Sequence, residues 1–178
     1  MPSYSFRFAH STFIGLAISV MLAAVPARGS GLILQAQEMT ALNRILNAGD
    51  SLHRSLVAQS EDQIEIGIRE LINQIDQARQ ASVNLKAHER GHLLLVLGAA
   101  REQFDQTQTA YGDERISRLI DGFNQLANLV RVYQVERSYG IFFCPEDKTS
   151  WVQKGYHGQN PFHPKTMLNC GIRVVNRN

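Results

Sequence analysis

The residues best suited to chemistry in this chain are two histidines four positions apart, His88 and His92, with Glu89 beside the first. On a helix this spacing places both imidazoles on one face, where they can bind zinc while the glutamate activates a zinc-bound water. However, Gly91 interrupts the short pattern, and the longer motif of the larger zinc peptidase families does not follow. We expect a polar helix start here. A zinc-dependent hydrolase and simple metal binding by the histidine pair are the alternatives.

The surroundings of the two histidines predict different burial. His92 borders the apolar residues Leu93 and Val96, so we expect it to be partly buried, whereas His88 follows Lys86 and should be exposed. A catalytic zinc ion needs three protein ligands, an open position and a shaped cleft. No residue of the sequence stands out as the third ligand, and we therefore predict that this motif is not a protease site.

A second group of potential metal ligands lies near the end of the chain. His157, His163 and Met167 carry imidazole and thioether groups, which suit copper or zinc. The alternative is that both histidines are exposed loop residues, and this is the interpretation that we favour.

The beginning of the chain has the pattern of a secretory signal peptide. Residues 1–27 hold Arg7, then an apolar run over 13–25, and end in Val25-Pro26-Ala27, with small residues where a signal peptidase cleaves. The apolar run is shorter than the roughly 20 residues needed to span a bilayer, which disfavours an uncleaved anchor. We expect a periplasmic protein that is not stably inserted in the membrane after cleavage.

Export determines how the two cysteines are interpreted. Cys144 and Cys170 lie 26 positions apart, and in an oxidising compartment two such cysteines usually pair. A disulfide that closes this loop would stabilise the fold by about 3 kcal/mol. Two thiolates that bind a soft metal are the alternative.

Composition limits the class of protein. The chain has 178 residues, 44% hydrophobic and 8% aromatic, with 18 basic and 16 acidic side chains. The length suits one domain with a small appendage. The balanced charge excludes an unusually basic nucleic-acid-binding protein and an acidic disordered chain, so nucleic acid is not an expected partner.

The elements that must position these residues are predicted to be helices. Between about residues 31 and 138 there is no proline, and apolar residues recur at steps of three and four. Four such stripes occupy residues 42–56, 64–78, 93–111 and 116–133, and His53 belongs to the first of them. Ser60 and Gln63 match a capping box, and Gly112 marks the last break. We predict an all-α, up-down antiparallel four-helix bundle over residues 28–138.

Composition changes at Tyr139. Residues 139–178 contain both cysteines, the single tryptophan, Trp151, and the three prolines outside the signal segment. Turn-forming residues replace the helical period there. We predict a loop-rich cap closed by a disulfide, with Trp151 buried between this cap and a bundle helix.

The cap also carries a family resemblance. Its signature is Phe143-Cys144-Pro145, Trp151, Asn160-Pro161-Phe162 and Met167-Leu168-Asn169-Cys170-Gly171, in this order. It resembles the C-terminal signature of a bacterial periplasmic helical domain of unknown function, which occurs free-standing and fused to adaptor proteins of copper/silver-type heavy-metal efflux pumps. That family commonly has methionine after Cys-Pro, where this chain has Glu146. Residues 115–133 resemble the family's last helix.

The resemblance implies a function in metal handling. We expect a non-enzymatic periplasmic accessory protein that binds copper or zinc, or binds an efflux adaptor or another envelope protein. A purely structural envelope protein and the zinc hydrolase built on His88, Glu89 and His92 are the competing classes.

Overall fold

The computed structural model describes residues 34–82 and 87–174, and for residues 87–90 it describes the backbone alone. Two predictions therefore lie outside the described residues: the signal peptide at 1–27 and the side-chain environment of His88 and Glu89. Among the described residues, no helix is both long and apolar enough to cross a membrane.

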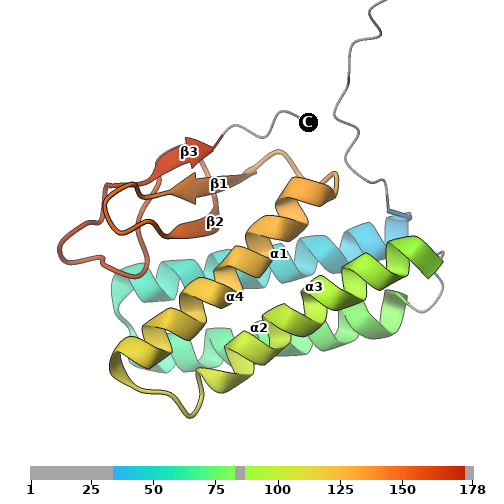
Figure 1. The fold of residues 1–178 in the computed structure, drawn as a ribbon, viewed down its shortest axis with the longest axis horizontal. Coiled ribbons are helices and arrows are strands. Elements are labelled where there is room, and N and C mark those ends of the chain that lie inside the picture. The colour runs from blue at the N-terminus through green and yellow to red at the C-terminus, as the bar shows by residue number, and fades with distance from the viewer. Residues whose placement is uncertain (1–33, 83–86, 175–178) are drawn as a thin grey trace, which may run out of the picture.

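Four helices form the larger part of the molecule, as the apolar periodicity predicts (Figure 1). They are α1 (Ala36–Ala58), α2 (Glu61–Ala81), α3 (Ala87–Gln106) and α4 (Gly112–Val132). The predicted stripes face inward and supply the fully buried core, to which the four helices contribute Ile45, Leu71, Leu97 and Phe123 among others. The exception is the end of the third stripe: α3 ends at Gln106, and Tyr111 is exposed. The four-helix prediction is confirmed.

The link between α1 and α2 is closed in a different way from the predicted capping box. Ser60 precedes α2, but its side chain makes no capping hydrogen bond, so that prediction is wrong. Instead, Gln59 adopts a left-handed conformation (φ 55°) and its N–H binds the Leu56 carbonyl, while the Ser60 N–H binds the Ser55 carbonyl. These backbone bonds satisfy the carbonyl groups at the end of α1.

The cap contains a small antiparallel sheet, so the prediction of a purely all-α protein is wrong. Its strands are β1 (Tyr139–Phe143), β2 (Ser150–Lys154) and β3 (Ile172–Val174), in the order β2-β1-β3. Residues 139–142 of β1 are all buried, because both faces of this central strand are covered. Such a strand has a continuous apolar sequence without the alternation that marks a half-exposed strand.

The sheet lies between the first and the last helix. Strand β2 packs against both α1 and α4, whereas α1 and α4 have few direct contacts with each other. Figure 1 shows the strands beside these two helices. Trp151 and Phe162 of the cap join the same hydrophobic core as the helices. The cap is therefore an integral side of the bundle.

Candidate functional site

The histidine motif lies in the first turns of α3, as predicted. The ring of His92 is half-buried, and its Nδ1 lies 2.9 Å from the hydroxyl oxygen of Tyr133, which follows the end of α4. A metal ion on Nε2 would leave the proton on Nδ1, and that N–H would then donate to Tyr133. A hydrogen bond of this kind orients a metal-binding histidine.

A complete metal centre is not formed by the described side chains. Among them, no three His, Cys, Asp or Glu residues lie close enough together to hold one ion. His157 is exposed, and its carbonyl oxygen accepts a hydrogen bond from Gln153. Met167 is half-buried and packs on the hydrophobic core, and its N–H binds the His163 carbonyl. Metal binding by these residues stays a prediction.

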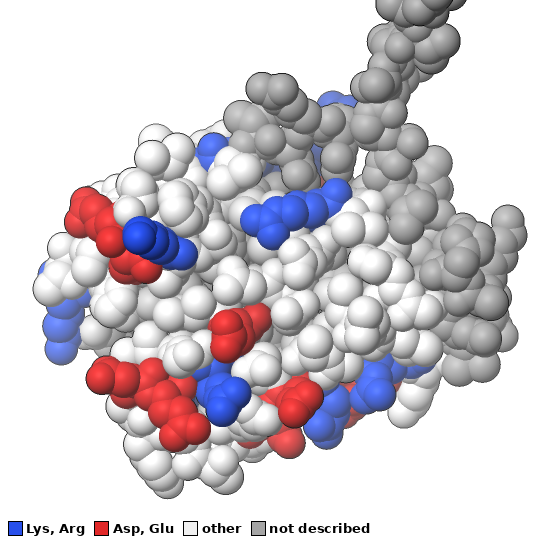
Figure 2. Space-filling view, in the orientation of Figure 1, with Lys and Arg blue, Asp and Glu red and all other residues white. Residues whose placement is uncertain are grey.

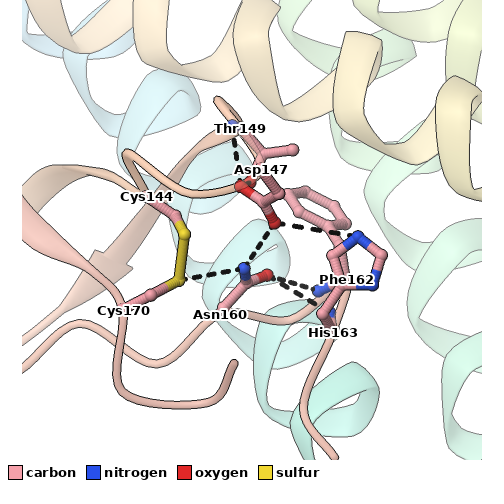
Figure 3. Close-up of a disulfide and its surroundings, with 7 residues drawn as sticks. All are labelled: Cys144, Asp147, Thr149, Asn160, Phe162, His163 and Cys170. Atoms are coloured by element: carbon pink, nitrogen blue, oxygen red, sulfur yellow. Dashed lines mark hydrogen bonds and ion pairs between the residues drawn. A yellow bond between two sulfur atoms is a disulfide. The ribbon is translucent and has the colours of Figure 1, made fainter. Parts of the chain in front are cut away.

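The predicted disulfide between Cys144 and Cys170 is confirmed. Their Cα atoms are 5.1 Å apart, within the range that a disulfide spans. Cys144 directly follows β1, and Cys170 lies two positions before β3, so the bond joins the segment after β1 to the segment before β3 (Figure 3). Neither sulfur is a free thiolate, which removes the alternative of a two-cysteine metal site in this state.

A buried amide connects the disulfide to the rest of the cap. The Nδ2 of Asn160 donates to Asp147 Oδ2 at 2.7 Å and to the Sγ of Cys170 at 3.2 Å. Its Oδ1 accepts from the backbone N–H groups of Phe162 and His163, at 2.9 and 3.3 Å. Figure 3 shows Asn160 between the disulfide and these groups. All of its hydrogen-bonding capacity therefore holds the cap in one conformation.

The carboxylate of Asp147 is the charged centre of this network. Its Oδ1 accepts from both the N–H and the hydroxyl of Thr149, at 2.9 and 2.7 Å. Burial would raise the pKa of Asp147, but the hydrogen bonds from Thr149 and Asn160 and the nearby His163 ring outweigh burial and lower that pKa. His163 Nε2 lies 3.7 Å from Asp147 Oδ2, so this histidine contacts the network without completing a metal site.

Trp151 is 0% exposed, which confirms its predicted burial. Its ring stacks on Phe142 and meets Phe162 edge-on, and Phe162 in turn contacts Phe123 of α4. A side chain at Gly171 would collide with the Trp151 ring, since a Cβ there would lie 2.7 Å from it. These signature residues therefore form the packed centre of the cap.

The other members of the signature have ordinary structural positions. Pro161 is buried beside Asn160, and Pro145 is exposed in the turn after β1. Neither of them presents a polar side chain, so they shape the backbone of the cap.

A row of polar residues on α1, which sequence reasoning missed, holds the sheet. Asn47 Oδ1 accepts from the hydroxyl of Tyr139 at 2.7 Å and from Lys154 Nζ at 2.8 Å. Asp50 Oδ1 accepts from the Lys154 N–H at 2.8 Å, and its other oxygen pairs with Arg54. The sequence signal that could have revealed this row is its spacing: Asn47, Asp50 and His53 lie three positions apart, next to the apolar residues of α1.

The third member of this row is His53. Its side chain is 2% exposed, and its Nε2 lies 2.7 Å from the carbonyl oxygen of Gln159 in the cap. Sequence reasoning placed His53 in the apolar stripe, and its burial agrees with that. Its partner in the cap could not be inferred, because it lies 106 positions away.

A cleft of about 580 Å³ lies where α4 ends and the sheet begins. Its apolar lining includes Val130, Ile141 and Val174, and its charged lining includes Arg137 and Arg173. The cleft lies along β3, which is an edge strand of the sheet. Its volume is within the range of clefts that bind ligands or peptide segments.

The surface is otherwise mixed in charge. On the face drawn in Figure 2, acidic and basic side chains are interspersed, and broad uncharged areas separate them. A surface of this kind does not attract a highly charged polymer. Comparison of the chain with models of known protein families, with curated proteins and with solved structures gives no match.

Proposed function

We propose that this chain is an exported, non-enzymatic accessory protein that binds an envelope protein and works in metal-ion handling. The observation that carries the proposal is the cleft beside the open edge of β3. An efflux adaptor is the partner that the signature of the cap favours, and copper or zinc is the cargo that it implies.

Export is supported by the disulfide and by the beginning of the chain. Cys144 and Cys170 are bonded to each other, and Cys144 is fully buried. Disulfides of this kind persist in oxidising compartments such as the periplasm. Residues 1–27 have the sequence pattern of a cleaved signal peptide.

Partner binding is supported by the apolar edge strand. Ile172 is 61% exposed and Val174 is 40% exposed, both on β3, whose strand partner among the described residues is β1 alone. An exposed edge can pair with an extended segment of another protein, with alternate side chains entering an adjacent pocket.

The charges of the cleft favour an acidic segment. Arg137 and Arg173 line it together with one acidic residue, Glu136. Arg173 is held in place because it donates to the carbonyl oxygens of Arg137 and Tyr139 and lies over the ring of Tyr156. We therefore infer that the bound segment is extended and apolar and carries a carboxylate that faces the arginines.

The link to metals rests on the signature and on the histidine pair of α3. His88 and His92 lie four positions apart, and Tyr133 orients the ring of His92. Nε2 of His92 is the nitrogen that this arrangement offers to an ion. A two-histidine site suits transient binding of copper or zinc as cargo, without catalysis.

Photocrosslinking in the native host tests the proposed partner surface. A photoreactive amino acid replaces Ile172 in one strain, and Leu95 of α3, which is also well exposed, in a control strain. The proposal expects a specific adduct at position 172 alone, mapped by mass spectrometry to an extended apolar segment with an acidic residue. The synthetic segment should bind the purified mature chain at least tenfold more weakly after Arg137→Glu.

Two results would overturn the proposed partner surface. One is equal crosslinking at positions 172 and 95, and the other is an unchanged affinity of the segment for the Arg137→Glu variant.

Metal analysis of untagged protein incubated with copper or zinc tests the cargo. Ion binding that His92→Ala leaves unchanged would refute a site on α3.

A further inference from the structure

The junction between α1 and the cap contains a buried histidine, His53. Nε2 of His53 faces the carbonyl oxygen of Gln159, which can only accept, so Nε2 carries a proton. In the neutral ring, Nδ1 then has no proton and carries a lone pair, which makes it a hydrogen-bond acceptor. This atom is buried and has no hydrogen-bond partner in the described part of the chain. The structure therefore accommodates the neutral ring and provides no acceptor for a second proton.

The groups around His53 do not compensate for a positive charge. The carboxylate that acts on His53, Asp50 on α1, already pairs with Arg54 and accepts the N–H of Lys154 from β2. Tyr139 of β1, a second buried titratable ring at this junction, donates to Asn47. Burial lowers the pKa of His53, the Gln159 hydrogen bond and Asp50 oppose that effect, and Arg54 adds to it. A proton on Nδ1 would thus be buried without an acceptor.

We propose that His53 is an acid-sensitive latch between α1 and the cap. The neutral ring holds residues 153–159 against the helix, and protonation requires the ring to reach water, which separates the loop from α1. The separation begins at the cap because Gln159 is the only hydrogen-bond partner that the described structure gives this ring. The proposal is independent of the partner surface at β3 and of metal binding.

The direction of the pH effect follows from the lowered pKa. The unfolded chain binds a proton on His53 near pH 6.5, and the folded chain binds it only at lower pH. Stability that depends on the neutral ring is complete above pH 6.5. It falls as the pH decreases from 6.5 to the pKa of the folded state. When the pH is below both pKa values, each unit of difference between them lowers the folding equilibrium constant about tenfold.

Amide exchange and unfolding at pH 7.5 and pH 5.0 test the latch. The wild type should lose stability at pH 5.0, and the amides of Lys154 and Gln159 should exchange faster relative to those of α2. His53→Gln keeps a donor for the Gln159 carbonyl but does not titrate, so it should lose most of this pH dependence. His157→Gln, at an exposed histidine, should behave as the wild type.

The latch is refuted if His53→Gln keeps the full pH dependence, or if exchange at acidic pH accelerates equally in the cap and in α2. A direct titration of the His53 ring by NMR in the wild type needs no variant and therefore covers the case in which His53→Gln does not fold. A measured pKa at or above 6.5 would also refute the latch.

Discussion

The indole N–H of Trp151 donates to Oε1 of Gln153 at 2.7 Å, two positions further along the same strand. Residues two apart on a strand point to the same face, so both side chains are directed into the cap. The Gln153 side chain also binds the N–H of Gln159 and the carbonyl of His157. The tryptophan and glutamine together connect the sheet to the loop that follows it.

Replacing the tryptophan should destabilise the whole protein, because the cap shares its core with the helices. We expect Trp151→Ala to lower the free energy of unfolding by about 3 kcal/mol or more, measured by urea denaturation. Trp151→Phe keeps the ring contacts and removes one of the two hydrogen bonds to Gln153 Oε1, because the Gln159 N–H still donates to it, so the loss should be smaller. Equal stability of the alanine variant and the wild type would contradict this packing.

The disulfide should stabilise the protein mainly by restricting the unfolded chain. We expect the double variant Cys144→Ala with Cys170→Ala to lose about 3 kcal/mol of unfolding free energy. The native protein should show no reactive thiol before reduction. Free thiols in the unreduced mature protein would contradict the bond.

The decrease in the free energy of unfolding at acidic pH should depend in part on Asp147. Its pKa is lowered in the folded state, so its contribution is complete above the unfolded value of about 4 and is lost as the pH falls below that value. Asp147→Asn should be less stable than the wild type at pH 7, because an amide nitrogen replaces an acceptor. This difference should shrink below pH 4, and a difference that is constant with pH would refute the assignment.

Two helical glycines should respond in opposite directions to alanine. A Cβ at Gly122 of α4 would lie 2.6 Å from the Phe104 ring, whereas nothing lies within 4 Å of one at Gly98 of α3. We expect Gly122→Ala to cost about 1–3 kcal/mol through overpacking. Gly98→Ala should stabilise the protein by up to about 1 kcal/mol through helix propensity. Thermal melting compares the two.

The histidine motif should not support peptide hydrolysis. The His92 ring forms a hydrogen bond with the Tyr133 hydroxyl, and the described residues provide no third metal ligand near it. We expect zinc-loaded protein to show no chelator-sensitive cleavage of unstructured peptides, and Glu89→Gln to leave this background unchanged. Chelator-sensitive activity that Glu89→Gln abolishes would establish the hydrolase instead.

The helices were predictable because each needs one apolar face. Each apolar stripe has the helical period, and one member from each helix, Ile45, Leu71, Leu97 and Phe123, is fully buried. The strands were not predictable from alternation, because Ile141 and Phe142 point to opposite faces of β1 and both faces are covered. In the sequence, a buried strand this short is only an apolar run between turns, and periodicity does not identify it as a strand.

The site was predictable in its residue types but not in its contacts. The burial of Trp151 was expected for a lone tryptophan among turn-forming residues, and the disulfide was expected from two cysteines in a chain with the pattern of a signal peptide. The network around Asn160 and the row Asn47, Asp50 and His53 depend on partners from distant parts of the chain. Local spacing shows which side chains share a helix face, but it does not show what lies opposite.

The position of the cap between α1 and α4 has a kinetic consequence. A nascent chain that has already made all four helices still exposes the apolar surface that Trp151 and Phe162 later cover. Folding therefore remains incomplete until the final quarter of the chain has been synthesised, and contacts between distant parts of the sequence form late. For the export that we propose, such a delay would be an advantage, because a secretion channel accepts an unfolded polypeptide.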